Sequence, residues 1–305
     1  MKNVFTLRSD YDDLPVSVLA VLPEEAPSAV LQIAHGMRGH KERFLPFMEF
    51  MAERGVACFA NDHRGHGASV LSPEDLGYLY KGGAKALVSD MKQLSDYISA
   101  SCPSVPFFLL GHSMGSLAAR VYMKIYDVPL AGAVICGSPS RNPLCGVGMM
   151  LTGVMSLWNE GRYRPSFMQK MTSYMYNRNF RNEGRDAWTC SDPQVRKAFA
   201  EDRLSCYDFT ANACHALMSM MNDAYSESGW RVERPSLPVL FLSGGDDPCM
   251  RGEKHFHESA YLMHKVGYRD VSSVLYPGMR HEILNEAGKE AVWNDIFRFV
   301  SNVSG

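Results

Sequence analysis

Ser113 is the first residue that could carry chemistry, because it stands between two glycines in Gly111-His112-Ser113-Met114-Gly115. A run of apolar residues precedes this G-x-S-x-G pattern and an apolar pattern with helical spacing follows it. Ser113 is therefore expected in a sharp turn from strand to helix. A Cβ on either side of such a turn would collide with the neighbouring strand or helix, which explains the two glycines. The turn would lift the hydroxyl above the sheet, so the pattern favours a nucleophile over an ordinary turn serine.

His281 is the best candidate for the base that a serine nucleophile requires. It lies in the loop 277–282, after the last predicted strand at 271–276 and before the last predicted helix. That loop is at the carboxyl edge of the sheet, where Ser113 also emerges. The sequence favours other places for the remaining histidines: the ring of His112 cannot reach back to the Ser113 hydroxyl, His255, His257 and His264 are expected on a solvent-facing helix, and His215 lies in a helical insertion.

A carboxylate is needed to fix the tautomer of the base and to stabilise its cation. Asp246 and Asp247 both follow the predicted strand 239–242. The pattern G-x-x-D-P indicates Asp247, while Asp246 is the second choice, and capping the turn or the next helix is its alternative role. The resulting chain order of Ser113, Asp247 and His281 is the order of the α/β-hydrolases and differs from the two other common serine-triad orders.

Two backbone N–H groups are expected to stabilise the oxyanion of such a reaction. Met114 supplies the first, because its N–H lies at the start of the helix after Ser113, where negative charge is favoured. The second is expected from Met37, in the loop that follows the predicted strand 29–34. Gly36 would permit a close approach of this backbone and is also a predicted substrate contact.

Histidines are dense in the loops 35–40 and 61–67. We expect the rings of His35 and His40 to bond backbone groups within their own loop. The second loop, Asn-Asp-His-Arg-Gly-His-Gly, is expected to be a hydrogen-bonded scaffold. A metal site is the alternative, with four possible ligands: His35, His40, His63 and His66. No metal is predicted, because a carboxylate-rich cluster of the form H-x-H-x-D-H is absent from the sequence.

Apolar runs and amphipathic patterns alternate along most of the chain. The expected strands are 4–7, 16–22, 29–34, 56–60, 105–110, 131–136, 239–242 and 271–276, of which the first two form an antiparallel hairpin. The expected helices are 42–54, 84–99, 113–126, 253–266 and 287–303. Most of these strands are apolar throughout, as in strands that helices cover on both faces. The alternation predicts an α/β fold with a doubly wound, mostly parallel sheet.

Residues 140–234 break this alternation, because they contain helix-like pieces but no clear buried strand. We therefore predict an α/β core formed by residues 1–139 and 235–305, with a helical cap, or lid, inserted at 140–234. Methionine is enriched in the insertion, and its flexible side chain adapts easily to an acyl chain. The predicted substrate-lining residues are Trp158, Phe167, Met171, Met175 and Tyr176, for which a place in the small core of the insertion is the alternative.

The bulk composition argues against several classes of protein. The net charge is −2, so the chain offers no basic surface for nucleic acid or for an anionic membrane. No apolar stretch is long enough to span a bilayer, and the first residues lack the pattern of a secretory signal. The eight cysteines are scattered without a C-x-x-C pair, as in a protein with reduced thiols, and we predict a cytoplasmic location.

Three loops together resemble one branch of the α/β-hydrolases, which contains monoacylglycerol lipases, lysophospholipase-like esterases and the serine aminopeptidase S33 group. The matching segments are 35–40, 62–67 and 111–115, while 72–78 resembles the lysophospholipase-like members. The resemblance spans nearly the whole chain outside residues 140–234. It implies a cap domain there and hydrolysis of carboxylic esters without a cofactor. It also implies a triad and an oxyanion hole: Ser113, Asp247 and His281, with the N–H groups of Met37 and Met114.

Three hypotheses about function follow from the sequence. The first is a serine hydrolase that cleaves medium or long acyl esters of the monoacylglycerol or lysophospholipid type, with transient contact to a lipid surface. The second is an aminopeptidase or amidase that uses the same triad. The third is a relative that only binds a ligand, and the complete triad argues against it. The choice of acyl group belongs to residues 140–234, where relatives of this branch differ most.

Overall fold

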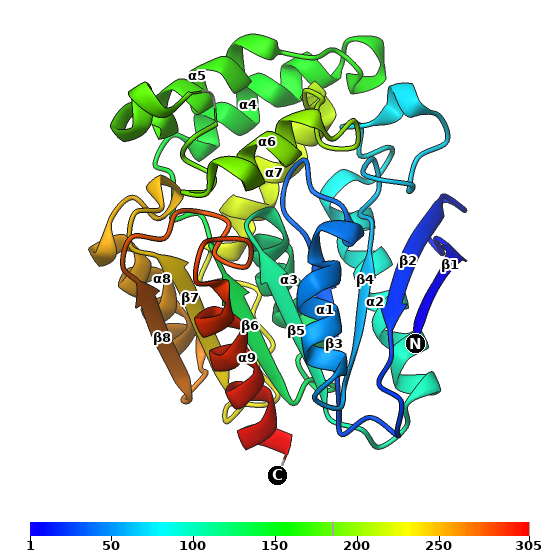
Figure 1. Cartoon of the computed structure of the whole chain (residues 1–305). Helices are drawn as coiled ribbons and strands as arrows, with labels where there is room; N and C mark the ends of the chain where they lie inside the picture. The colour runs from blue at the N-terminus through cyan, green and yellow to red at the C-terminus, as the bar shows by residue number, and fades with distance from the viewer. Residues whose placement is uncertain (185, 305) are drawn as a thin grey trace.

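The computed structural model describes residues 1–184 and 186–304, and Figure 1 shows a central sheet with helices on both faces and more helices above one end. The strands are β1 Lys2–Arg8, β2 Pro15–Val21, β3 Ala29–Ala34, β4 Val56–Asn61, β5 Phe107–His112, β6 Gly132–Cys136, β7 Val239–Gly244 and β8 Val271–Tyr276. Their order in the sheet is β1-β2-β4-β3-β5-β6-β7-β8. Strand β2 pairs antiparallel with β1 and β4, and the remaining pairs are parallel. The predicted α/β fold is confirmed.

Helices cover both faces of this sheet and bury its continuous apolar strands. The main helices are α1 Leu45–Ala52, α2 Gly83–Ser101, α3 Met114–Tyr126, α8 Glu253–Val266 and α9 Lys289–Ser304. One apolar cluster joins the strands to α1 and α9. A second cluster, on the other face, joins them to α2, α3 and α8. Because both faces are covered, every residue of β3 to β7 is buried, as expected of strands inside a parallel sheet.

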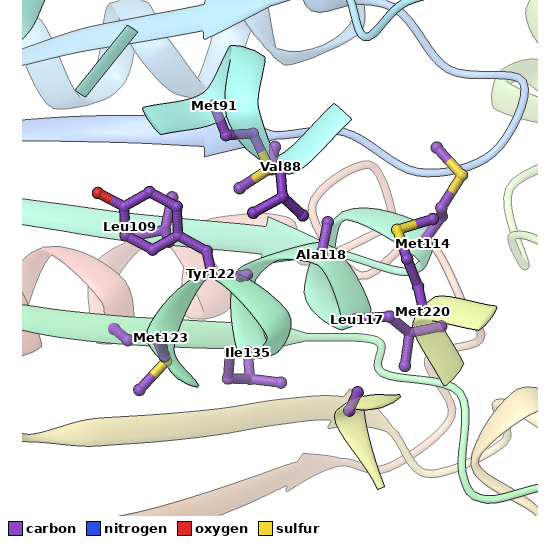
Figure 2. Close-up of a cluster of buried hydrophobic side chains, with 14 of the residues drawn as sticks. Val88, Met91, Leu109, Met114, Leu117, Ala118, Tyr122, Met123, Ile135 and Met220 are labelled. Atoms are coloured by element: carbon purple, nitrogen blue, oxygen red, sulfur yellow. The ribbon is translucent and has the colours of Figure 1, made fainter. Parts of the chain in front are cut away.

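Helix α3, which begins directly after Ser113, lies at the centre of the second cluster. Figure 2 shows its apolar side chains between those of helix α2 and of strands β5 and β6. Met114, Leu117, Ala118 and Tyr122 are all at most 1% exposed. The side chain of Met114 thus anchors the first turn of α3 in the core, which fixes the position of the preceding serine.

One predicted helix is divided in the structure, and one strand, although predicted with the correct bounds, is less buried than the others. The predicted helix 42–54 is divided into a 3-10 turn at Lys41–Phe44 and the α-helix α1, because Pro46 lacks the N–H needed to continue a helix through it. Strand β8 alternates between less and more exposed residues, because it is the edge strand of the sheet, and one of its faces is only partly covered. Val274 is 36% exposed there.

Residues 140–234 contain helices and no strand within their described part. The helices are α4 Cys145–Ser156, η3 Asn159–Gly161, α5 Ser166–Tyr176, η4 Asn177–Glu183, α6 Pro193–Glu201 and α7 Ala211–Ala224. Figure 1 shows α4 and α5 outermost, with α6 and α7 between them and the sheet. Helix α7 joins the core cluster around α3 through Ala213 and Met220. No helix of the described residues is long and apolar enough to cross a membrane.

Candidate active site

Ser113 occupies a strained turn between β5 and α3. Its φ is 54° and its ψ is −119°, a conformation that non-glycine residues rarely adopt. A Cβ on Gly111 would lie 2.3 Å from the Gly115 carbonyl oxygen, and a Cβ on Gly115 would lie 2.1 Å from the carbonyl oxygen of Ala34. Both contacts are with backbone that cannot yield, so the two glycines of the motif are required by packing around the serine.

The structure brings Ser113, His281 and Asp247 into one chain of hydrogen bonds. The Ser113 Oγ lies 2.8 Å from His281 Nε2, and His281 Nδ1 lies 2.8 Å from Asp247 Oδ2. The carboxylate requires a proton on Nδ1, which leaves Nε2 free to accept from the serine hydroxyl. Burial disfavours a charged imidazole, but the Asp247 carboxylate prevails and holds the pKa of His281 well above its ordinary value. The arrangement therefore stabilises the cation that a general base forms.

Further contacts hold the histidine and the carboxylate in place. Asp247 accepts a hydrogen bond of 2.8 Å from the backbone N–H of Cys249 on its other oxygen. The second-choice carboxylate, Asp246, is exposed and is not the partner of His281. His112 donates from Nε2 to the carbonyl oxygen of His281 at 3.1 Å, so its ring holds the backbone of the His281 loop in place. Burial, the largest cause, lowers the pKa of His112 to about 4 and keeps this ring neutral.

Met37 and Met114, the predicted oxyanion donors, lie on the two sides of Ser113. Met114 is the first residue of α3, where the N–H groups have no partner within the helix. Met37 lines the pocket that opens at Ser113. A Cβ on Gly36 would lie 2.9 Å from the Cβ of Ser113, so only glycine lets this loop come so close to the serine. The placement is compatible with the predicted oxyanion hole, which remains a prediction.

The pocket at Ser113 is a cavity of about 60 Å³ between the loops of the sheet edge and segment 186–199. Its lining includes Gly36, Met37, Arg38, Arg43, Phe44, Ser113, Asp186, Trp188, Thr189, Phe199, His281, Glu282 and Asn285. The ring of Trp188 lies 5.1 Å from the ring of His281, and the ring of Tyr176 lies 5.0 Å from that of Trp188. Sequence reasoning missed Trp188 and Phe199, because no motif or spacing connects them with the strands that carry the triad.

Four predicted substrate-lining residues lie away from the pocket at Ser113 in this structure. Trp158, Phe167, Met171 and Met175 are 75%, 51%, 55% and 62% exposed, and none of them lines the pocket at Ser113. The physical reason is that α4 and α5 form the outermost layer and bury few of their residues, with Met168 the buried one of α5. They form neither a tunnel to the serine nor a core of the insertion. Tyr176 is absent from the lining of this pocket, but its ring packs against Trp188 and its phenol forms a hydrogen bond with the Cys249 thiol beside Asp247.

Glu183 and residues 186–191 form hydrogen bonds and an ion pair with the loop that carries His281. The Glu282 N–H donates to the Thr189 carbonyl at 2.7 Å, and Arg280 Nη2 contacts both Glu183 carboxylate oxygens at 2.8 Å. Arg280 Nη1 also donates to the carbonyl of Ala187 at 2.6 Å. These contacts hold Trp188 over the imidazole, so this part of the helical insertion forms a wall of the pocket.

The histidine-rich loops form a buried scaffold, as predicted for loop 61–67. His35 donates from Nδ1 to the Gly36 carbonyl at 2.8 Å and accepts at Nε2 from the backbone N–H of His63 at 2.9 Å. Burial, the largest cause, lowers the pKa of His63 to about 3 and that of His66 to about 4, so both rings are neutral. Arg64 is fully buried and pairs with Asp90 at 2.8 Å. These contacts stiffen the loop on which Met37 lies.

The four-histidine metal site considered for these loops is not formed. Across residues 1–184 and 186–304, two groups of possible ligands come together: His40 with Glu42 and Asp62, and Asp247 with Cys249 and His281. The first group already surrounds the ammonium of Lys41, whose Nζ lies 2.9 Å from Glu42 and 2.7 Å from Asp62.

His40 makes a different contact from the one predicted, because its ring bonds carboxylates and not backbone. Nδ1 lies 2.8 Å from Glu42 Oε2 and Nε2 lies 2.7 Å from Asp202 Oδ2, beyond the end of α6. Although burial opposes the charge, the two carboxylates raise the pKa of His40 above its usual 6.5. The Arg38 guanidinium also donates to the Ser205 carbonyl at 2.8 Å. The loop that carries Met37 is thus tied to the helical insertion.

Replacing Asp202 by asparagine is expected to destabilise the protein at acidic to neutral pH and much less at alkaline pH. A histidine whose pKa is raised on folding contributes its full stability below 6.5 and loses it as the pH rises through the raised value. A hydrogen bond to a charged group contributes about 2 kcal/mol, so thermal melts at pH 6 should differ by a few degrees. Asp96→Asn, at an exposed helical pair, is the control. A difference that is equal at pH 6 and pH 9 would contradict the charged state of His40.

A family model described as serine aminopeptidase, S33, matches residues 25–288. The chain belongs to this family. A monoacylglycerol lipase of Mycolicibacterium smegmatis is 26% identical to this S33 member over 91% of the chain and 90% of its own length. A monoglyceride lipase of Mus musculus is 33% identical over 87% of the chain and 78% of its own length.

Solved structures share the fold of this S33 member. A thermostable carboxyl esterase from Bacillus coagulans, crystallised with glycerol, superposes with a TM-score of 0.92 over 100% of the chain and 99% of its own. Their sequences are 23% identical, so this likeness concerns the fold. Together with the family match, it places the chain in the α/β-hydrolase superfamily.

Proposed function

We propose that this S33 member cleaves carboxylic esters through an acyl-enzyme, with Ser113 as nucleophile, His281 as general base and Asp247 as the carboxylate that orients it. The observation that carries the proposal is the chain of two hydrogen bonds through these residues. Ser113 Oγ lies 2.8 Å from His281 Nε2, and His281 Nδ1 lies 2.8 Å from Asp247 Oδ2. Nucleophile, base and orienting group within hydrogen-bond reach are the signature of covalent catalysis by serine.

The reaction proceeds in two steps that use the same groups. Ser113 Oγ attacks the ester carbonyl while His281 Nε2 accepts the hydroxyl proton, and the N–H groups of Met37 and Met114 stabilise the oxyanion. His281 then gives the proton to the leaving alcohol, and an acyl-Ser113 ester remains. Water, deprotonated by His281, attacks this ester and releases the carboxylic acid together with the free serine. Throughout, Asp247 holds the Nδ1 proton and stabilises the imidazolium.

The protein is a carboxylic ester hydrolase, and for its substrate we propose esters of the monoacylglycerol or lysophospholipid type. Support comes from the relatives named monoacylglycerol lipase and monoglyceride lipase. The cavity of about 60 Å³ at Ser113 is far smaller than the roughly 300–1,000 Å³ of ordinary ligand pockets. A long acyl chain therefore enters only if the wall formed by Trp188 and Phe199 moves aside.

Residues 140–234 act as the cap over this site in our proposal. Contacts of Thr189 and Glu183 with the His281 loop, and of Asp202 with His40, attach this segment to both sides of the pocket. The outer face of α4 and α5 carries exposed apolar side chains: Val147, Met150, Val154, Leu157, Trp158, Phe167, Met171 and Met175. A face of this kind, which we call the α4–α5 apolar face, suits transient contact with a dispersed lipid substrate.

A panel of substrates tests both parts of the proposal. We expect hydrolysis of p-nitrophenyl esters and 1-monoacylglycerols with medium and long acyl chains, and negligible cleavage of proline p-nitroanilide. Val154→Glu places a charge on the α4–α5 apolar face and should reduce hydrolysis of dispersed monoacylglycerol about tenfold, which corresponds to ~1.4 kcal/mol. Hydrolysis of monomeric p-nitrophenyl acetate should be unchanged.

The control for this panel is Val128→Glu, which charges an exposed valine outside the insertion. It should leave both reactions unaffected. Preferential cleavage of the proline amide would contradict the ester hydrolase and favour the aminopeptidase. An equal loss on dispersed and monomeric esters in Val154→Glu would contradict the role of the α4–α5 apolar face.

A further inference from the structure

The thiol of Cys249 lies beside the hydrogen-bonded pair of Asp247 and His281. The proposed reaction does not use this thiol. One ligand atom from each of these three residues lies within 4.8 Å of the other two. All three are buried, with exposures of 4%, 2% and 4%. A thiol, an imidazole and a carboxylate therefore converge on one small volume behind the catalytic histidine.

The donor set of this cluster is the one that a soft divalent cation prefers. Zn²⁺ in proteins is bound tetrahedrally by cysteine sulfur, histidine nitrogen and carboxylate oxygen. Tyr176 supplies a fourth oxygen, because its phenol forms a hydrogen bond with the Cys249 thiol. Among the ion pairs of the described residues, Asp247 pairs with His281 alone, so no lysine or arginine neutralises its carboxylate. The His40 cluster differs in this respect, because Lys41 already fills it.

A groove other than the pocket at Ser113 lies next to Asp247. It has a volume of about 460 Å³ and is lined by residues that include Asn179, Phe180, Asp247, Pro248 and Arg251. Asp247 thus takes part both in the chain to the serine and in the wall of a separate groove. The Asp247 carboxylate is itself buried beneath this groove, which is separate from the pocket at Ser113.

We propose that Asp247, Cys249 and His281 form an inhibitory binding site for a soft divalent cation, of which Zn²⁺ is the type. The cation binds Asp247 through a carboxylate oxygen, Cys249 through Sγ and His281 through Nδ1, with Tyr176 or a water in the fourth position. The thiol releases its proton to the solvent, while the imidazole stays neutral and its single proton moves from Nδ1 to Nε2 by exchange with water. No electron is transferred.

Occupation of this site stops the reaction, an effect that rests on the proposed function. Once Nδ1 is bound to the cation, Asp247 no longer holds a proton there and cannot stabilise an imidazolium. With its proton on Nε2, the metal-bound imidazole also has no free lone pair to accept the proton of Ser113. The inhibition is reversible, because removal of the cation lets the thiol regain its proton and lets the imidazole proton return to Nδ1, which restores the original hydrogen bonds.

Titration of the full chain with ZnCl₂ in a buffer that does not chelate metal tests the site. We expect Zn²⁺ to inhibit p-nitrophenyl ester hydrolysis and EDTA to restore the rate. Each variant is compared with its own rate without metal. Cys249→Ser and Cys249→Ala should each raise the inhibitory Zn²⁺ concentration about tenfold or more, because even outer contacts of a metal site are worth this much. Cys190→Ser, which removes another buried thiol near the His281 loop, should respond like the unaltered chain.

Calorimetry with Ser113→Ala protein separates the metal site from the proposed catalytic function. Zn²⁺ should bind to Ser113→Ala with one strong site, and this site should be lost in Ser113→Ala/Cys249→Ala. Thermal melts without metal establish that each variant is folded. Equal Zn²⁺ binding with and without Cys249 would overturn the proposal, as would a lack of binding by folded Ser113→Ala. If the metal binds through Cys249 but does not affect ester hydrolysis, the inhibitory role is refuted.

Discussion

Replacement of Ser113 by alanine is expected to lower kcat for p-nitrophenyl ester hydrolysis by a factor on the order of 10⁶. The hydroxyl is the only group of the proposed triad that forms a bond with carbon, so His281 and Asp247 have no substitute for it. A small rate above that of water should persist, because the N–H groups of Met37 and Met114 still stabilise the oxyanion that forms when water attacks the ester carbonyl. The measurement is the steady-state rate, together with labelling by a fluorophosphonate probe, which should require Ser113.

The matched control for this variant is Ser138→Ala. Ser138 is also buried at the carboxyl end of a strand, and its hydroxyl has no hydrogen-bond partner among the described residues. We expect near-normal activity and normal probe labelling from this control. A Ser113→Ala protein that is folded and still hydrolyses the ester at a comparable rate would refute the triad. Lack of labelling of the unaltered, folded protein would favour a ligand-binding relative.

The central sheet could be predicted because its strands are buried on both faces. Such strands are apolar at every position, so β3 was located at the correct residues and β4 to β7 within two residues at each end. Helices α2, α3 and α8 have one apolar stripe, which periodicity detects equally well. Strand β8 was also located at the correct residues, although it is an edge strand with one face partly exposed. Prediction was less exact where a single residue changes the outcome, as with Pro46.

The meeting of Ser113, Asp247 and His281 could be predicted because each follows a strand at the same edge of the sheet. The chemistry of a serine nucleophile also limits which residue types can stand there. The rest of the pocket follows no such rule. Trp188 reaches His281 because Thr189 and Ala187 accept hydrogen bonds from the His281 loop. These contacts join segments that are about a hundred residues apart along the chain, and no periodic pattern indicates them.

The helical nature of residues 140–234 was predicted, but the predicted lining residues are not found at the pocket, for a related reason. Aromatic and methionine residues on α4 and α5 look the same in the sequence whether they face a substrate, a core or the solvent. Their position depends on which layer lies beneath the helix, and α6 and α7 occupy that layer here. The contact of His40 with Asp202 was also missed, because Asp202 is distant in sequence and carries no motif.

The second large effect is expected from Gly115→Ala, which adds one methyl group behind Ser113. The new Cβ would lie 2.1 Å from the carbonyl oxygen of Ala34 and 2.6 Å from that of His35. Both atoms are backbone, at the end of strand β3 and at the start of the loop that leads to Met37. They can yield only if α3 and the Met37 loop move apart, which separates the two predicted oxyanion donors.

The helix propensity of alanine favours the substitution, whereas the close backbone contacts oppose it. The sign of the change in unfolding free energy therefore shows which of the two is larger. Gly115 is a helical residue of α3 without a positive φ, and alanine in a helix interior is favoured over glycine by about 1 kcal/mol. Overpacking of a core typically costs about 1–3 kcal/mol and occasionally more. We therefore expect Gly115→Ala to lower the free energy of unfolding. A displacement of about 1 Å at the reacting groups costs about 100-fold in rate, and kcat should fall at least this far.

Gly146→Ala provides the matched control, because Gly146 lies in helix α4 and a Cβ there would meet nothing within 4 Å. This variant should be as stable as the unaltered chain or more stable by up to ~1 kcal/mol, with unchanged hydrolysis of monomeric esters. Chemical unfolding gives the stabilities, and p-nitrophenyl acetate gives the rates. If Gly115→Ala behaves like Gly146→Ala in both measurements, then the close contact of α3 with the end of β3 does not set the position of Ser113, and the glycine of the motif needs another explanation.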